Sequence, residues 1–264
     1  MLYFSKGLFI LFALSMNSFS SCSSDEKHSK EEQITAPDSE EPGTDSSSTI
    51  NSVQGNMAIG QIASTPNAVI LTGMPEHRLV TVYKDKPAGQ ASNDRKWFYK
   101  GAYDDDVTSA EEHFMPGIDI LYGYNLLNIA HYDLTSGKLN FMFKHSALIK
   151  TLYYPSFEQD SLNKQPINRN YYLVSVYDED TNKDTLINRK DLRRFYHFDA
   201  ATSLKTQLVP ANYSVIRSQY DSRNDVMYLY ASYDANKNGT RDQGEPVHIF
   251  WFNLAAPQKA KRLY

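Results

Sequence analysis

Hydrophobic and polar positions alternate in short runs along residues 57–264, and turn-forming residues separate the runs. A period of two residues is typical of β-strands, in which successive side chains point to opposite faces. No stretch carries the 3.6-residue period of a long amphipathic helix. We expect strands at residues 68–71, 78–83, 96–103, 118–124, 126–133, 139–143, 148–154, 171–177, 194–199, 205–209, 214–220, 226–233, 247–254 and 260–263. The pattern predicts an all-β fold.

A short motif recurs where these strands end. Residues 131–138, His-Tyr-Asp-Leu-Thr-Ser-Gly-Lys, align with residues 197–205 and more loosely with residues 251–259. Each copy ends one strand, passes through a polar turn and begins the next, which divides the chain into three units. These units resemble blades of a β-propeller, and the resemblance implies repeated four-stranded antiparallel blades. Because propellers usually have about four to eight blades, we expect a partial or small propeller-like fold, an open stack, or a pair of chains.

The most specific motif is loop B, residues 234–245, which reads Asp-Ala-Asn-Lys-Asn-Gly-Thr-Arg-Asp-Gln-Gly-Glu between two expected strands. In the EF-hand calcium loop, positions 1, 3, 5, 9 and 12 provide oxygen side chains, position 7 provides a carbonyl oxygen and position 6 is glycine. Loop B resembles this pattern throughout, with Gly239 at position 6 and Arg241 in place of the usual aliphatic residue at position 8. The implied calcium ligands are Asp234, Asn236, Asn238, the carbonyl of Thr240, Asp242 and Glu245.

Loop A, residues 180–191, is a second copy of the motif, with Thr185 at the glycine position. A register that begins at Asp178 competes, but only the register from Asp180 ends in an acid. The implied ligands are Asp180, Asn182, Asp184, the carbonyl of Leu186, Asn188 and Asp191. Both loops are expected to be inserted in hairpins, where calcium acts as a clip, as in dockerin-like modules, with a dissociation constant of about 10⁻⁴ to 10⁻³ M. The alternative is that Asn and Gly form tight turns without metal.

The first 56 residues differ from the rest in composition. Lys6 precedes an apolar run at residues 8–14, too short to span a bilayer, which predicts a signal peptide over residues 1–21. Ser20-Ser21-Cys22 resembles the lipobox of bacterial lipoproteins, which implies a lipid on Cys22. Phe19 departs from the usual aliphatic residue, and the alternative is a free buried cysteine.

Residues 22–56 contain few large aliphatic side chains, so this segment is expected to be a disordered linker before one β-repeat domain at residues 57–264. The acidic residues shortly after Cys22 resemble the tether of surface-exported lipoproteins, although a plain spacer has a similar composition. The resemblance implies a protein of the cell envelope, anchored to the outer membrane and exposed at the surface.

Charge and motifs exclude some functions. The net charge is −4, without a basic stripe, so nucleic-acid binding is not expected, and a single cysteine allows no intrachain disulfide. Motifs for a hydrolase nucleophile elbow, a zinc-binding His-Glu-x-x-His helix and a phosphate-binding glycine loop are absent. A glycan hydrolase stays open as an alternative, because its two carboxylates need no sequence motif.

Two further groups of residues are candidate sites. Asp104, Asp105 and Asp106 with Glu111, Glu112 and His113 form an acidic stretch that either binds a cation or is a solvated loop. His131 and His197 occupy equivalent places in neighbouring units, where a packing role is favoured over metal binding.

Together these features predict a non-catalytic, lipid-anchored calcium-binding protein that acts as a binding or structural module. Its frequent aromatic residues suit a carbohydrate or peptide ligand. The alternatives are the glycan hydrolase and a subunit of an envelope assembly.

Overall fold

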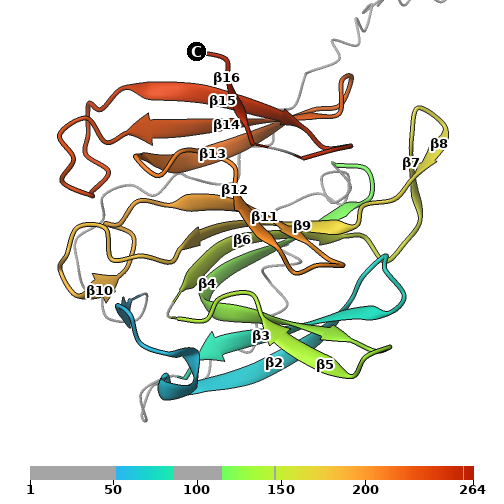
Figure 1. Ribbon diagram of the computed structural model, residues 1–264. Coiled ribbons are helices and arrows are strands. Elements are labelled where there is room, and N and C mark those ends of the chain that lie inside the picture. Colours follow the sequence, from blue (N-terminus) through green and yellow to red (C-terminus); the bar gives the residue numbers. More distant parts are fainter. Residues whose placement is uncertain (1–51, 86–114, 146, 258) are drawn as a thin grey trace, which may run out of the picture. The chain divides into compact units, whose positions relative to one another are not determined.

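A computed structural model describes residues 52–85, 115–145, 147–257 and 259–264 (Figure 1). The expected signal peptide, Cys22, the strand at residues 96–103 and the acidic stretch at residues 104–113 lie outside the described residues. The described residues contain no α-helix, and their one helical turn is the 3₁₀ segment η1 (Ile59–Gln61). None of their helical segments is long and apolar enough to cross a membrane.

The described chain is a series of antiparallel strands, so the expectation of an all-β fold is confirmed. The strands are β1 (Val53–Gln54), β2 (Ser64–Leu71), β3 (His77–Lys84), β4 (Ile118–Asp133), β5 (Lys138–Phe141), β6 (Leu148–Pro155), β7 (Asp160–Leu162), β8 (Gln165–Ile167), β9 (Tyr171–Tyr177), β10 (Leu186–Ile187), β11 (Arg194–Asp199), β12 (Lys205–Gln207), β13 (Tyr213–Asp221), β14 (Val226–Tyr233), β15 (Val247–Asn253) and β16 (Lys261–Arg262). The short strands β1, β7, β8 and β10 were not expected, because two or three residues carry no readable alternation.

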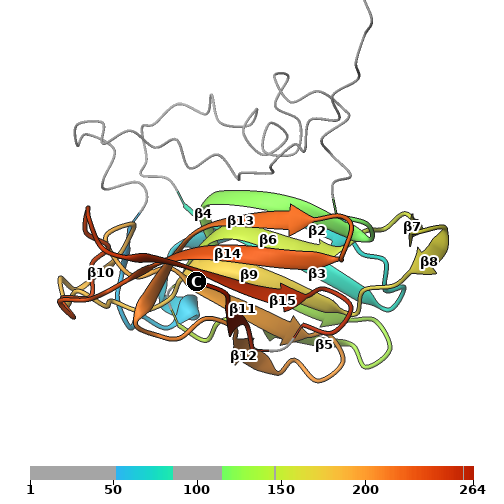
Figure 2. The same ribbon diagram turned by 90° about the horizontal axis from the view of Figure 1, so that it is seen from above.

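An eight-stranded sheet has the order β12-β11-β9-β6-β4-β3-β2, with β5 paired to β4 beside this path. A four-stranded sheet has the order β13-β14-β15-β16, in which each strand pairs with its neighbour in sequence (Figure 2). Two pairs of short strands, β1-β10 and β7-β8, complete the topology. None of these sheets closes on itself.

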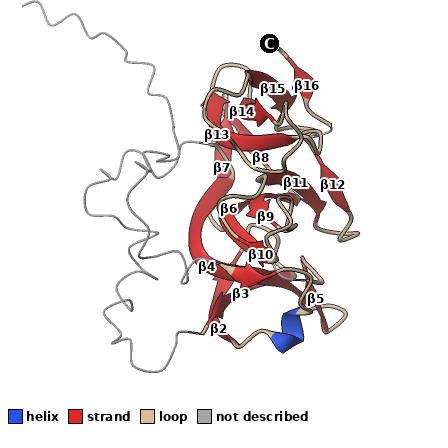
Figure 3. Ribbon diagram, turned by 90° about the vertical axis from the view of Figure 1, so that its left-hand side faces the viewer, coloured by secondary structure: helices blue, strands red, loops and turns tan. Residues whose placement is uncertain are grey.

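The expectation of two separate strands at residues 118–124 and 126–133 is wrong, because both ranges belong to the continuous strand β4 (Figure 3). Its first half pairs with β6 and its second half pairs with β3 and β5. At Gly123 an added Cβ would lie 2.4 Å from the carbonyl oxygen of Ile149, so only glycine permits this close passage. A register shift between Tyr122 and Leu126 accompanies it.

Two hydrophobic clusters use opposite faces of β9. Tyr171 and Leu173 belong to a cluster with side chains of the four-stranded sheet, including Leu229 and Phe250. The alternate residues of β9, Tyr172, Val174 and Val176, belong to a second cluster. This cluster includes Leu79 of β3, Ile129 of β4 and Phe198 of β11. Because β9 is buried on both faces, it lies at the centre of the packed structure.

The repeated motif forms equivalent turns. Asp133 Oδ1 accepts a hydrogen bond from the N–H of Thr135 (2.9 Å), and Asp199 Oδ1 accepts one from the N–H of Thr202 (2.7 Å). Four residues after each aspartate the backbone is left-handed, with φ of 67° at Gly137 and 57° at Ser203. The internal repeat thus reflects a shared turn that the aspartate side chain stabilises.

Candidate metal centre

Loops A and B occupy equivalent places in the fold. Loop A connects β9 to β11, and loop B connects β14 to β15; in each case the two strands pair antiparallel. Both 12-residue segments are therefore insertions in hairpins, as the sequence predicts.

The position-1 aspartates fold the two loops in the same way. In loop A the carboxylate of Asp180 accepts hydrogen bonds from the N–H groups of Asp184 (3.0 Å) and Thr185 (2.9 Å). In loop B the carboxylate of Asp234 accepts them from Asn238 and Gly239, both at 3.1 Å. Positions 5 and 6 are thus tied to position 1 in both loops.

Positions 3 and 5 repeat the correspondence. The Oδ1 atoms of Asn182 and Asn236 each accept a hydrogen bond from the position-5 N–H at 3.0 Å. At position 5, Asp184 Oδ1 accepts from the N–H of Leu186 (2.9 Å). Asn238 Oδ1 likewise accepts from the N–H of Thr240 (2.8 Å).

The position-12 carboxylates close both loops. Asp191 accepts hydrogen bonds from the N–H groups of Thr181 (2.8 Å) and Asn188 (2.9 Å), at positions 2 and 9. Glu245 accepts from the same positions of loop B, Ala235 (3.3 Å) and Asp242 (3.2 Å). Asp191 and Glu245 therefore accept hydrogen bonds from the same two positions of their loops, although their side chains differ in length.

The backbone angles agree as well. Position 4 has a left-handed φ of 63° at Lys183 and 58° at Lys237. Position 6 has a left-handed φ of 73° at Thr185 and 76° at Gly239. Thr185 thus adopts the glycine conformation, which is unfavourable for a β-branched residue, and the hydrogen bond of its N–H to Asp180 helps to hold it there.

The side chains that line the loops fit a hard cation in their chemistry. Asn236 Nδ2 and Asn238 Nδ2 lie 2.9 Å and 2.7 Å from Asp242 Oδ2, so positions 3, 5 and 9 of loop B converge. In loop A, Asn182 Nδ2 lies 3.2 Å from Asp184 Oδ2. Carboxylate, amide and carbonyl oxygens are the ligands that calcium prefers, and these positions offer all three kinds.

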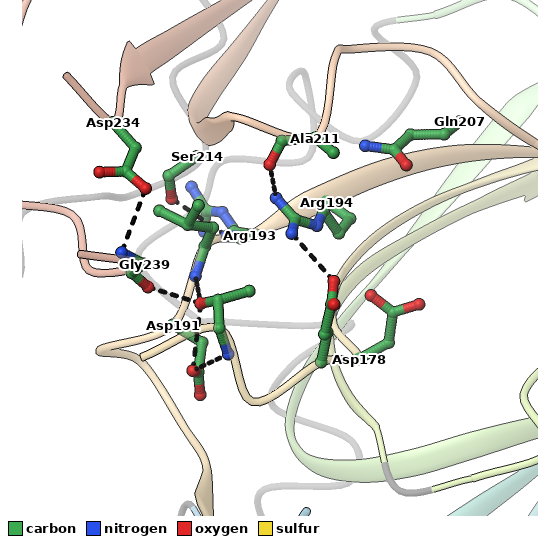
Figure 4. Close-up of polar contacts among 12 residues, drawn as sticks. Asp178, Asp191, Arg193, Arg194, Gln207, Ala211, Ser214, Asp234 and Gly239 are labelled. Atoms are coloured by element: carbon green, nitrogen blue, oxygen red, sulfur yellow. Dashed lines mark hydrogen bonds and ion pairs between the residues drawn. The ribbon is translucent and has the colours of Figure 1, made fainter. Parts of the chain in front are cut away.

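The two loops contact each other directly (Figure 4). Thr181 Oγ1 donates a hydrogen bond to the carbonyl oxygen of Gly239 (2.5 Å), and Asp191 forms a β-bridge with Thr240. An added Cβ at Gly239 would lie 1.9 Å from the carbonyl oxygen of Thr181. Thr181, at a position that is not a ligand in the motif, was not identified from the sequence, because no sequence signal marks a contact between separate hairpins.

Loop A is also anchored at its base. Asp191 is fully buried, and this burial raises the pKa of its carboxyl while the hydrogen bonds from Asn188 and Thr181 oppose the rise. Two buried arginines follow after Leu192: the N–H of Arg193 donates to Ser214 Oγ (3.0 Å), and Arg194 Nη2 donates to Glu179 Oε2 (3.0 Å). The end of loop A is therefore fixed to the start of β13 through Ser214.

The other candidate sites receive less support. Within the described residues, no three His, Cys, Asp or Glu side chains cluster in a way that would hold a metal ion. The loop motif depends on amide and carbonyl oxygens as well as on carboxylates. His131 and His197 are not brought together, since His131 Nε2 lies 2.8 Å from His77 Nδ1 while His197 packs against the ring of Tyr171.

Comparison with known proteins gives no assignment. No protein-family model matches the chain, and no curated protein matches it. The geometry of the two loops is therefore the main indication of function.

Proposed function

We propose that this protein is an exported, lipid-anchored calcium-binding module with a non-catalytic binding or structural role at the cell envelope. The observation that carries the proposal is that loops A and B, which differ at nine of twelve positions, share the same hydrogen bonds and left-handed residues. Independent tight turns have no reason to match position by position.

Calcium is the preferred ion because of the ligand set. Each loop offers three carboxylates together with neutral amide and carbonyl oxygens, and it offers no sulfur or imidazole ligand. Calcium accepts six to eight oxygens in flexible geometry, whereas magnesium demands near-octahedral geometry and retains several waters. When bound, the ion would offset the negative charge of the carboxylates that ligate it.

The arrangement of strands supports the propeller-like part of the proposal. The runs β2-β3-β4-β5, β6-β9-β11-β12 and β13-β14-β15-β16 are each four-stranded meanders, and hydrophobic clusters lie between successive runs. Propeller blades are likewise four-stranded antiparallel meanders, although here the pairing of β4 with β6 joins the first two runs into one sheet. Loops A and B then lie at the same hairpin of the second and third runs.

Calorimetric titration of the purified full-length protein with calcium tests the proposal. The wild-type protein is expected to release or absorb heat at two sites, and Asp180→Ala and Asp234→Ala are each expected to remove one. With a dissociation constant of about 1 mM, 10 mM calcium should stabilise the fold by about 1.4 kcal/mol per site. Glu158→Ala, which removes an exposed acid outside the loops, is the matched control.

Absence of heat and of any change in melting temperature at 10 mM calcium would contradict the proposal. Equal responses of wild-type and Asp234→Ala protein would place the ion elsewhere. No observation among the described residues favours the glycan hydrolase.

A further inference from the structure

The four-stranded sheet has a second face that is directed away from its hydrophobic cluster. Met227, Leu229, Phe250 and Phe252 point into the cluster, so the alternate residues of β14 and β15 occupy the opposite face. The strand register places on that face Arg217, Gln219, Tyr228, Tyr230, Ile249, Trp251 and Lys261, here called the aromatic face. All seven side chains are partly or fully exposed.

Two cations lie over aromatic rings on this face. The guanidinium carbon of Arg217 lies 3.4 Å from the ring centre of Tyr230, and Lys261 Nζ lies 5.4 Å from that of Trp251. Among the described residues neither cation has a carboxylate partner, and Arg217 Nη1 is buried without any hydrogen-bond acceptor. A buried donor without an acceptor is unfavourable, so Arg217 retains capacity to bind an anion once its side chain turns outward.

The spacing of the cations indicates the size of the ligand. Arg217 lies on β13 and Lys261 on β16, three strand spacings apart, which corresponds to about 14 Å. A single small anion cannot contact both groups, whereas a chain with regularly spaced charges can.

Charge also argues against a second copy of this protein as the occupant. A symmetric dimer through the aromatic face would bring the cations of one chain close to those of the other. The nearest acid along the strands, Asp221, is engaged by the turn that follows it, where it accepts hydrogen bonds from Arg223 and Asn224.

We propose that the aromatic face binds an anionic polysaccharide, with sugar rings stacked on Trp251 and Tyr228 and sulfate or carboxylate groups paired with Arg217 and Lys261. Aromatic side chains offer a flat apolar surface with polar edges, which suits the C–H faces of sugars. This inference gives the binding role proposed above a ligand class, and it uses no metal.

Calorimetric titration of the full-length protein with dextran sulfate and with neutral dextran, which share one backbone, tests this inference. Dextran sulfate is expected to bind and dextran to bind much more weakly. The double substitution Arg217→Gln/Lys261→Gln should weaken binding of dextran sulfate about tenfold, the sum of two exposed charge contacts. Trp251→Leu should also weaken it, and Lys138→Gln, an exposed cation on β5, should not.

Equal affinity of the wild-type and double-substituted proteins for dextran sulfate, or no binding at all, would overturn the proposal. Equal binding of poly-L-glutamate, with no effect of Trp251→Leu, would assign the face to an acidic peptide instead. Self-association in size-exclusion chromatography that the double substitution abolishes would assign it to a second copy. If the protein binds dextran sulfate but gives no heat on calcium titration, the calcium proposal is wrong and the polysaccharide proposal still holds.

Discussion

At the scale of single residues, position 6 of the two loops gives a matched pair of predictions. Gly239→Ala should destabilise the protein by about 2 to 3 kcal/mol, because the new Cβ would overlap the backbone of Thr181. Thr185→Gly should stabilise it by about 0.5 to 1 kcal/mol, since the relief of a left-handed β-branched residue exceeds the entropic cost of glycine. Urea unfolding of both variants checks these values. Loss of stability in Thr185→Gly would show that Thr185 is not strained.

The repeated turns predict a dependence of stability on pH. The N–H and the hydroxyl of Thr202 donate to Asp199 and lower the pKa of its carboxyl. Because this pKa is lower in the folded state, the stabilisation is present above the ordinary pKa of 3.8 and is lost as the pH falls through the folded value. Asp199→Asn should therefore cost about 1 kcal/mol at pH 7 and less than this at pH 2.

Urea unfolding at pH 7 and pH 2 measures the effect of Asp199→Asn. Glu76→Gln, at an exposed carboxylate, is the control and should change stability little at either pH. A cost that is equal at both pH values would mean that the charge of Asp199 does not stabilise the turn.

At the scale of elements, the contact between the loops predicts that the two proposed calcium sites are coupled. Thr181, at position 2 of loop A, bonds to position 6 of loop B, so ordering of one loop should favour order in the other. Calcium affinity at loop B should fall about fivefold when Asp180→Ala inactivates loop A, the lower end of typical coupling. Thr181→Val, which keeps the shape but removes the hydroxyl, should bring this factor close to one.

A double-mutant cycle of calcium titrations with Asp180→Ala and Thr181→Val measures the coupling. Thr206→Val, on an exposed part of β12, is the control for loss of a threonine hydroxyl. Independent sites in the wild-type protein would contradict the coupling without affecting the metal proposal.

Much of the architecture of these elements could be predicted from the sequence. Strands β9, β11 and β14 have the expected bounds, because alternating side chains and flanking turns determine them locally. The continuity of β4 could not be predicted, since residues 124 and 125 resemble a turn and the tight contact at Gly123 depends on a neighbouring strand. The residues proposed as calcium ligands were identified from their spacing alone, whereas the contact between the loops depends on which hairpins become neighbours.

At the scale of the whole molecule, a buried ion pair connects the two large sheets. Arg169, just before β9, donates from Nη2 to Asp225 Oδ1 (2.7 Å) and from Nη1 to Oδ2 (3.0 Å), and Asp225 lies in the turn between β13 and β14. The arginine side chain is 1% exposed, so removal of its partner would leave a buried charge. Asp225→Ala should cost about 3 to 5 kcal/mol.

Equilibrium unfolding in urea measures this cost, and Arg169→Met/Asp225→Leu is the informative comparison. Because the double variant leaves no unpaired charge, it should be more stable than Asp225→Ala. A single variant that loses less than about 1 kcal/mol would show that solvent reaches Arg169.

The pairing of β1 with β10 gives loop A a mechanical role. Val53 and Gln54 pair with Ile187 and Leu186, and the N–H of Gly55 donates to the carbonyl oxygen of Thr185 (2.8 Å). Strand β1 and Gly55 are thus hydrogen-bonded to positions 6 to 8 of loop A. A force that pulls on the chain before Ser52 would break the pairing of β1 with β10 before it disrupted the two large sheets. If loop A binds calcium as proposed, a force on this part of the chain would lower the calcium affinity of loop A, and bound calcium would raise the force needed to separate β1 from β10.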